Sequence, residues 1–349
     1  MIPESSVSPP PGFPHRMAAH CESGTVSTLL GAGGLKLSEA MVFGITGAVC
    51  FVYLDSTDLP FPTIAMRNQP GEIWQNTQKV LGADFSPQTF KTPAAGFEAL
   101  DRLLDQGERV AAQVDFFHMD YIPAYARAHF NAHFITVVGR VPSDPGGGSD
   151  GVYIVSDSYA PELTTLSRRS LELARFARGR FAPKGLLLHL KGPVPTPDME
   201  KAVREGIRAA TSRMVSLPLP FLGVRGIRRF AERVKHWRSL ARSEEHFTHE
   251  LMMVYVAIEE RGTGGGGFRF LYASFLQEAA GLLGRSELAE LAGEMMENGD
   301  RWRDISLRAA VLGKRGGVTP EHLTELSGLI LARADVEERL FRRLAALKI

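Results

Sequence analysis

The sequence predicts an α+β protein whose first half mixes helices with strands and whose second half is helical. Three strand-like runs lie in the first half, at residues 109–117, 132–139 and 151–157, and helical patterns precede them. From residue 167 onward, apolar residues recur almost throughout at helical spacing. Helices followed by a group of strands favour an antiparallel sheet over alternating βαβ units.

Charge and length support a division into two domains. Residues 1–165 contain 9 Lys and Arg against 17 Asp and Glu, a net charge of −8, whereas residues 166–349 contain 31 against 22, a net charge of +9. A chain of 349 residues is long enough for two cores. We therefore predict a disordered, Pro- and Ser-rich lead-in at 1–15, an α+β domain at 16–165 and a helical domain at 166–349.

The first half contains elements of both kinds, in a clear order. Helices are predicted from residue 21 to glycines at 31–34, and at 37–43, 71–81 and 94–106; strands are predicted at 44–54, 63–66, 109–117, 132–139 and 151–157. The Gly and Pro content of residues 142–150 predicts a hairpin-type loop between the last two strands.

The second half is predicted to contain one returning strand and a series of helices. The strand is at 185–190, and the helices are at 170–180, 199–214, 223–241, 244–261, 268–283, 286–312 (with a break near Asn298 left open) and 319–347. Glycines at 262–267 separate two of these helices. We interpret Gly264 to Gly267 as a flexible linker or lid, or as a substrate loop that presents Arg269.

Cys21 is the candidate nucleophile. It stands at the start of a helical run in which Val26, Leu29 and Leu30 share one face. The positive end of the helix dipole and the unpaired N–H groups there favour a thiolate and could stabilise an oxyanion. The alternative is a buried structural cysteine. Cys50, inside a continuous apolar run, is predicted to be a buried structural thiol.

A cysteine nucleophile needs a base and a group that orients the base. His133 begins the second strand-like run and Asp157 ends the third, so adjacent antiparallel strands would bring them together. The alternatives are a core histidine and a turn-forming aspartate. A helical Cys followed by a His and an Asp on strands is the order of papain-like domains, so we predict a papain-like catalytic domain with the triad Cys21, His133 and Asp157.

Several motifs resemble one family. The stretches 20–25, 37–40 leading to 43–44, 113–115 and 133–139 resemble the N-terminal domain of the butirosin biosynthesis protein H family. More distantly, His133 with residues 155–157 resembles the His and Asp pattern of papain-like bacteriocin-leader peptidases. The stretch 258–269, with Tyr272 and residues 275–279, is similar to the uncharacterised helical domain that commonly follows the N-terminal domain.

The resemblance implies an acyltransferase of specialised metabolism, and the use of only two cysteines independently fits a reducing cytoplasm. An acyl carrier protein or peptidyl carrier domain would deliver the acyl group on its phosphopantetheine. Cys21 would take the group as a thioester and pass it to a small-molecule amine, giving an amide. His133 would move the protons, Asp157 would hold its tautomer, and the helical domain would cover or shape the cleft. Neither ATP nor another cofactor is implied.

Two other kinds of function stay open. One is hydrolysis, as a thioesterase or as a cysteine peptidase or amidase; an open groove would favour it, and a water-excluding pocket with an amine site would favour transfer. The other is a non-catalytic scaffold that binds carrier-tethered intermediates, which an unreactive Cys21 would favour. The acyl group, the acceptor and the oligomeric state are not determined by the sequence, and a chain-elongating or cyclising reaction, in which the acceptor amine belongs to the substrate itself, also stays open.

Weaker candidates surround the predicted triad. Candidates for oxyanion stabilisation or substrate binding are His20, Glu22, Asp115, Tyr121, Tyr159 and Arg269. Asp115 would suit a cationic amine, or is a strand-end carboxylate. Because no glutamine lies a few residues before Cys21, the second oxyanion donor would be His15 or His20. His118 and His129 could line a pocket, and no metal site is expected.

Other features narrow the function further. Seven basic residues between 223 and 242 predict either a docking surface for an acidic carrier or a solvated face: Arg225, Arg228, Arg229, Arg233, Lys235, Arg238 and Arg242. No nucleic-acid recognition motif, P-loop or dinucleotide fingerprint accompanies them. Two cysteines cannot form a disulfide framework, and no run of 18 apolar residues predicts a membrane span.

Overall fold

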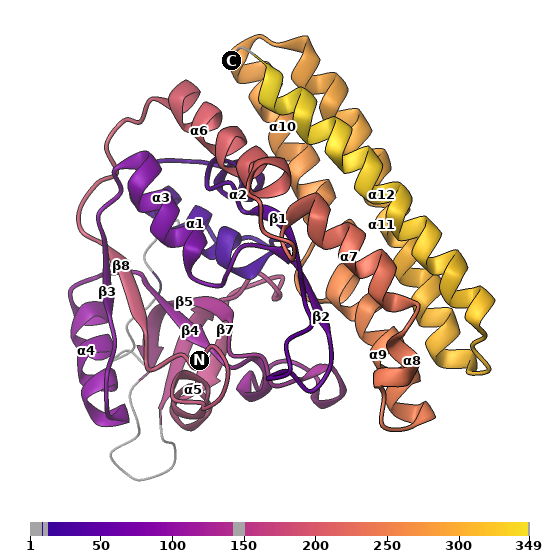
Figure 1. Cartoon of the computed structure of the whole chain (residues 1–349). Helices are drawn as coiled ribbons and strands as arrows, with labels where there is room; N and C mark the ends of the chain where they lie inside the picture. Colours follow the sequence, from indigo (N-terminus) through magenta and orange to yellow (C-terminus); the bar gives the residue numbers. More distant parts are fainter. Residues whose placement is uncertain (1–8, 10–12, 142–150, 348–349) are drawn as a thin grey trace. The chain divides into compact units, whose positions relative to one another are not determined.

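The structure is a computed structural model that describes residues 9, 13–141 and 151–347 (Figure 1). The predicted lead-in therefore lies largely outside the described residues, and the predicted loop at 142–150 lies wholly outside them. The chain forms two compact units. Residues 1–42 and 70–197 make the first, and residues 43–69 and 198–349 make the second.

The first unit combines helices with most of the strands. Its helices are α1 (Cys21–Ala32), α3 (Glu72–Leu81), α4 (Pro93–Asp105), α5 (Arg168–Arg175) and the short 3₁₀ segments η1 (Phe116–His118) and η2 (Ala124–Ala126). Its strands are β3 (Phe85–Gln88), β4 (Val110–Val114), β5 (His133–Val141), β6 (Val152–Ser156), β7 (Thr164–Ser167) and β8 (Leu187–Leu190). Helix α2 (Glu39–Ile45) spans the point where the chain first leaves this unit.

These six strands form one antiparallel sheet in the order β3-β8-β4-β5-β6-β7. The returning strand β8 lies between β3 and β4, so residues 166–197 complete the sheet instead of starting the second unit. The contact-based division thus differs from the single predicted boundary at 165. Strands β3 and β7 were not predicted, because both are short and mostly polar, unlike the equally short but apolar β8.

The sheet is buried on both faces. Apolar side chains of alternate residues, including Val110, Ala112 and Ile135, join those of α4 and α5, such as Leu100 and Leu171, in one core cluster. Residues 134, 136 and 138 alternate with these, are also buried, and therefore belong to the opposite face. Helix α1 packs against β5. This arrangement confirms the predicted α+β class and places the cysteine-bearing helix against the sheet as in papain-like domains.

The second unit is mostly helical. Its helices are α6 (Met199–Thr211), α7 (Gly223–Val234), α8 (Trp237–Leu240), α9 (Glu244–Tyr255), α10 (Arg269–Leu283), α11 (Ser286–Arg315) and α12 (Pro320–Ala346), with π segments η3 (Ser212–Ser216) and η4 (Val256–Glu260) and the 3₁₀ segment η5 (Gly266–Phe268). Strands β1 (Val49–Leu54) and β2 (Thr63–Arg67) form a separate antiparallel pair, and β1 packs against α7. A helical C-terminal part is therefore confirmed.

The glycine-rich segment is a packed turn, and the prediction of a linker or lid there is not supported. Gly264 to Gly267 all have positive φ, between 54° and 85°, a region that favours glycine because it has no Cβ. Gly266 and Gly267 are buried, and a Cβ on Gly267 would lie 2.2 Å from the Met66 side chain. The glycines therefore allow a tight turn and close packing.

Helix α11 runs without a break through Asn298. The following residue, Gly299, faces the ring of Phe270, where a Cβ would lie 2.5 Å from a ring carbon. The glycine thus serves close packing of α10 on α11 and does not end the helix. None of the helices in the described ranges is long and apolar enough to span a membrane.

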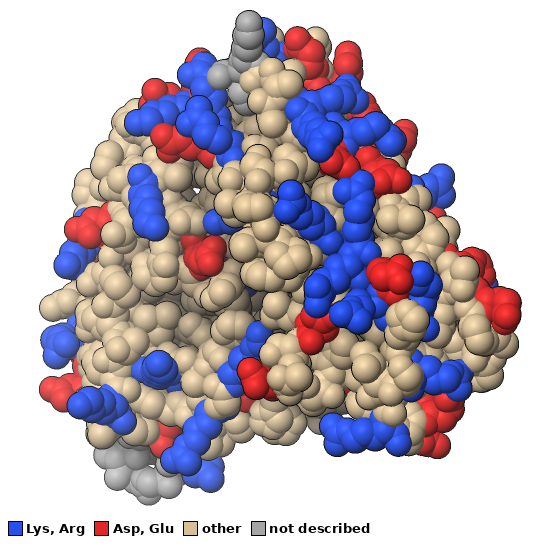
Figure 2. All heavy atoms as spheres, viewed as in Figure 1, with Lys and Arg blue, Asp and Glu red and all other residues tan. Residues whose placement is uncertain are grey.

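The basic residues of α7 and the segment after it are largely engaged in ion pairs. Figure 2 shows Lys and Arg side chains gathered over this part of the surface, with acidic side chains among them. The pairs are Arg228 with Asp335 and Glu338, Arg229 and Arg233 with Asp55, Lys235 with Glu232, and Arg238 with Glu244. Such pairing favours the solvated face over a docking surface.

Candidate active site

Cys21 is the first residue of α1. The preceding residue, His20, is the N-cap, and its Nδ1 accepts a hydrogen bond from the Ser23 amide at 3.3 Å. The Glu39 carboxylate accepts from the amides of Ala19 and His20 at 2.8 and 3.1 Å, which fixes the backbone just before the cysteine. The Cys21 amide lies in the first turn, where N–H groups lack intrahelical acceptors, so it is placed to bind an oxyanion.

The structure brings His133 and Asp157 together beside Cys21. His133 is the first residue of β5, and Asp157 directly follows β6, which pairs with β5 in antiparallel register. His133 Nε2 lies 2.8 Å from Asp157 Oδ2, and both side chains are buried. Cys21 Sγ donates to the Ala132 carbonyl oxygen at 3.8 Å, and the Cys21 side chain also interacts electrostatically with the imidazole. Because Nε2 is engaged by Asp157, Nδ1 is the ring nitrogen that remains available for proton exchange with the sulfur.

The electrostatics of the pair favour a charged imidazole. Burial alone would lower the pKa of His133, but attraction to Asp157 and Cys21, with hydrogen bonds to both, raises it to about 10. Burial alone would raise the pKa of Asp157, but His133 and hydrogen bonds from neighbouring groups lower it. At neutral pH the site therefore holds an imidazolium and a carboxylate.

Tyr121 belongs to this hydrogen-bond network. Its hydroxyl donates to Asp157 Oδ2 at 2.5 Å, the same oxygen that accepts from His133. Burial, followed by repulsion from the Asp157 charge, raises the pKa of Tyr121 well above its usual value, so the phenol stays protonated as a donor. The sequence placed Tyr121 in a substrate pocket; no local signal indicated that it would reach Asp157.

Tyr159 and Phe116 lie beside the imidazole. The Phe116 ring makes edge contacts with His133 and Tyr159, with centroids 5.1 and 5.4 Å apart. The Tyr159 amide donates to Asp157 Oδ1 at 3.0 Å, while its side chain is 47% exposed. Tyr159 is thus anchored at its backbone and leaves an aromatic surface accessible next to the candidate triad, and its role as a substrate contact stays a prediction. Phe116 was not predicted.

Two candidates near Cys21 have structural partners instead. The buried carboxylate of Glu22 accepts from the amides of Ile73 and Trp74, at the start of α3, and so ties α1 to α3. His15 bonds to Ser156 Oγ at 2.8 Å and to the Ala160 carbonyl at 3.2 Å. Both ring nitrogens of His15 are engaged, and the His20 side chain serves as the N-cap. These bonds therefore do not direct either histidine towards an oxyanion at Cys21.

Asp115 is buried and engaged within its own loop. Its Oδ1 accepts from the Phe130 amide at 2.7 Å, and its Oδ2 lies 2.7 Å from His129 Nδ1. His118 is the third member of this cluster, with Nε2 3.8 Å from the same Oδ2. The strand-end role weighed for Asp115 therefore describes it better than direct binding of a cationic amine.

Arg269 lies in the second unit and is fully buried. Its guanidinium forms a two-bond ion pair with Glu337, at 2.8 Å for each bond, and donates to the carbonyls of Gly267 and Cys50. Asn298 and Trp302 also donate to Glu337. The expectation that Arg269 is presented to substrate is thus not met; the side chain instead crosslinks the packed glycine turn to α12.

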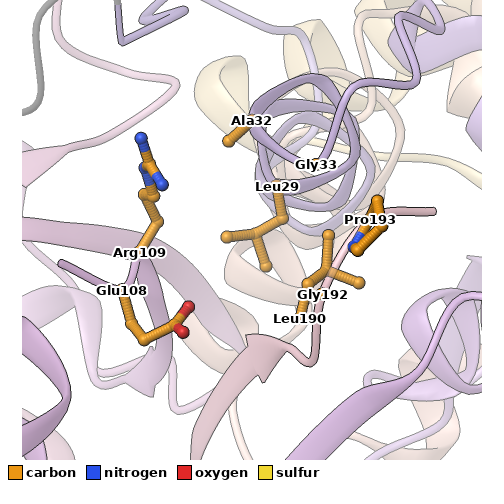
Figure 3. A pocket seen from close by; sticks show the side chains of 8 residues that line it. All are labelled: Leu29, Ala32, Gly33, Glu108, Arg109, Leu190, Gly192 and Pro193. Carbon is orange, nitrogen blue, oxygen red and sulfur yellow. The ribbon is translucent and has the colours of Figure 1, made fainter. Parts of the chain in front are cut away.

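A pocket of about 300 Å³ lies at the other end of α1 (Figure 3). The side chains of Leu29 from α1 and Glu108 from the turn before β4 point into it. Leu29 is eight residues after Cys21, so the pocket begins about 12 Å further along the helix axis. It is therefore separate from the thiol and does not hold the reacting groups.

Comparison with known families matches both parts of the chain. Residues 20–158 match the family described as "Butirosin biosynthesis protein H, N-terminal", and residues 169–344 match "Domain of unknown function (DUF4872)". No curated protein matches the sequence. The first description names a biosynthesis-related protein. The resemblance inferred from the motifs is confirmed: the chain belongs to the butirosin biosynthesis protein H family, with its N-terminal domain followed by DUF4872.

Proposed function

We propose that this protein is a cysteine-dependent acyltransferase that forms an amide. The acyl group would move from a carrier-protein thioester to Cys21 and from there to an amine. The observation that carries the proposal is the buried His133–Asp157 pair beside Cys21, the first residue of α1. A thiol beside a charged imidazole, with helix amides next to the sulfur, suits acyl transfer through a covalent intermediate.

The first step would be acylation of Cys21. The thiolate attacks the thioester carbonyl and forms a new C–S bond, while the carbonyl electrons move to oxygen near the Cys21 amide. Collapse of this intermediate breaks the bond to the phosphopantetheine sulfur. The His133 imidazolium donates its Nδ1 proton to that leaving thiolate. The products are an acyl-Cys21 thioester, a carrier thiol and a neutral imidazole.

The second step would be attack by the amine. Acylation removes the charge at Cys21, one of the attractions that raise the pKa of His133, so the imidazolium loses its proton more readily and the resulting neutral imidazole can act as a base. It takes a proton from the attacking nitrogen, a C–N bond forms, and the C–S bond to Cys21 breaks. The thiolate and imidazolium are restored, and an amide is released. Because an amide is more stable than a thioester, the reaction needs no ATP.

The surroundings of the triad support a bulky or apolar acyl group. Tyr159 and Phe116 provide aromatic surface next to His133. Docking of the carrier on the basic residues of α7 has less support, because most of them are already paired with acidic side chains. We also propose that a carrier protein is the acyl donor, that the protein acts in the cytoplasm and that the helical domain covers the cleft.

Intact-mass spectrometry with acyl-N-acetylcysteamine thioesters tests the proposal. We expect wild-type protein to gain the mass of one acyl group and Cys21→Ala to gain none. The second cysteine supplies a matched control, since Cys50 is buried in β1 and Cys50→Ala should be acylated like the wild type. Addition of a panel of amines should discharge the adduct as an amide, detected by its mass.

Other outcomes would point elsewhere. Release of the free acid at equal rates with and without amines would favour the thioesterase or amidase alternative. Absence of an adduct across a broad acyl panel, with Cys21 also slow towards iodoacetamide, would remove the nucleophile and favour the non-catalytic carrier-binding scaffold.

A further inference from the structure

We propose that Asp115, His118 and His129 form a binding site for one divalent transition-metal cation such as Zn²⁺. The proposal does not depend on acyl transfer. The carboxylate Oδ2 of Asp115, Nε2 of His118 and Nδ1 of His129 each offer one ligand atom, and these three atoms lie within 4.8 Å of one another. Among the described residues, these three form the group of His, Cys, Asp or Glu side chains whose ligand atoms lie close enough together to hold a metal ion.

The carboxylate is held in a fixed orientation. The side chain of Asp115 is 2% exposed, and its Oδ1 accepts from the amides of Phe130, at 2.7 Å, and Phe117, at 3.4 Å. These bonds leave Oδ2 directed at the two histidines, 2.7 Å from His129 and 3.8 Å from His118. One oxygen is thus used for folding and the other faces both imidazoles.

The two rings are also positioned by packing. Phe117 stacks on His129 with centroids 4.1 Å apart and meets His118 edge-on at 5.3 Å. The spacing of these residues in the sequence does not predict the cluster, because Asp115 and His118 lie at η1 while His129 comes from the segment before β5. The turn between them folds the two segments together. A search for fixed metal-ligand spacings would miss it.

The donor set determines the class of cation. Two imidazole nitrogens and one carboxylate oxygen suit borderline divalent metals better than Ca²⁺ or Mg²⁺, which prefer all-oxygen sites. Metal–ligand bonds of about 2.0–2.2 Å require His129 and Asp115 to separate slightly. The His129 side chain is 70% exposed, so it can make this small shift, and solvent can reach the remaining coordination positions.

A bound cation would brace one wall of the candidate active site. It would crosslink η1 to the segment that leads into β5, adding metal–ligand bonds to the existing contacts of Asp115 with His129 and Phe130. Phe116, the first residue of η1, contacts the ring of His133. Fixing η1 would therefore fix the aromatic wall beside the imidazole. We infer a structural role for the metal and no role in the acyl-transfer steps.

Metal binding to the full chain, purified without a polyhistidine tag and stripped with EDTA, tests the proposal. Zn²⁺ is titrated against a chromophoric chelator, and Co²⁺ is added separately to record its visible spectrum. We expect one tight Zn²⁺ per chain, a rise in melting temperature with Zn²⁺, and Co²⁺ bands of a low-coordination site. His129→Ala and His118→Ala should each weaken binding by at least about 10-fold, since even outer-shell changes have effects of that size.

Two control variants separate this site from other metal-binding groups. Cys21→Ala should keep its Zn²⁺, which distinguishes the cluster from the thiol and imidazole of the candidate triad. His236→Ala, an exposed histidine of the second unit, should also keep it. Because the His129 side chain is exposed, His129→Ala should fold. Its Zn²⁺ affinity therefore tests the proposal even if His118→Ala does not fold. Equal binding by wild type and His129→Ala, or loss of binding in Cys21→Ala, would overturn the proposal.

Discussion

The Tyr121 hydroxyl and Asp157 Oδ2 lie 2.5 Å apart, and this oxygen also accepts the hydrogen bond from His133. The carboxylate therefore receives two side-chain donors on one oxygen and the Tyr159 amide on the other. All three donors lower the pKa of Asp157 and so help to keep the carboxylate ionised. Tyr121 thus acts through Asp157 on the orientation and charge of His133, as a positioning residue.

Removal of the Tyr121 hydroxyl should weaken this network without dismantling it. A hydrogen bond to a charged group contributes about 1.5–3 kcal/mol, so Tyr121→Phe should lower the rate of Cys21 acylation by about 10-fold or more. The rate should also begin to fall at a higher pH on the acid side, because loss of the hydrogen bond destabilises the ionised form of Asp157 and so raises its pKa. Tyr125→Phe, at a 92% exposed side chain, serves as the control. Identical pH profiles for Tyr121→Phe and wild type would rule out the positioning role.

His133 should control the reactivity of Cys21. An unassisted thiol is only about 1% thiolate at pH 6.5, so loss of the imidazolium in His133→Asn should slow alkylation of Cys21 by iodoacetamide at that pH by at least about 10-fold. The difference should shrink as the pH is raised. Peptide mapping follows Cys21 and the buried Cys50 in the same sample. Equal alkylation of Cys21 in both proteins at the lower pH would contradict a thiolate–imidazolium pair.

The buried pair should make stability depend on pH in a defined window. The pKa of His133 is raised from 6.5 to about 10, so its contribution is complete below pH 6.5 and is lost as the pH rises through about 10. The pKa of Asp157 is lowered from 3.8, so its contribution is present above that value and is lost as the pH falls through the folded pKa. Both contributions are therefore complete between pH 3.8 and 6.5.

Asp157→Asn tests this window by urea denaturation. Breaking a buried pair removes about 3–5 kcal/mol, so the variant should lose free energy of unfolding by roughly that amount near pH 6. At about pH 9.5 the loss should be clearly smaller, because the wild type has then lost most of the His133 contribution. A loss of stability that is the same at both pH values would show that the ion pair is not its cause.

Arg269 should matter for folding and not for substrate affinity. Arg269→Met leaves Glu337 buried without its ion-pair partner, which should reduce the free energy of unfolding by about 3–5 kcal/mol. The apparent KM for the acyl donor, measured at a temperature where the variant is folded, should stay within about twofold of the wild type. A raised KM with unchanged stability would restore the substrate-binding role predicted from the sequence. Arg225→Met, at an exposed position of α7, is the control for removal of an arginine.

Local pattern was enough to predict most helices of this protein and the strands that carry the candidate triad. The helix that begins at Cys21, and the strands whose ends hold His133 and Asp157, follow from apolar periodicity and turn residues that act within a few positions. Motifs close to these residues were also enough to indicate the family. The Leu37–Ala40 stretch belonged to that resemblance, although only the structure shows that Glu39 binds the amides before Cys21.

The partners of individual polar side chains were decided by tertiary structure. Nothing near Tyr121 in the sequence indicates Asp157, and nothing near Arg269 indicates Glu337, because each pair is formed by segments far apart in the chain. The same holds for the placement of β8 inside the sheet and for the meeting of Asp115 with two histidines. Sequence determines which groups are available and which local elements carry them. Long-range packing decides which charges are buried and which group each must face, because a buried polar atom is stable only with a partner.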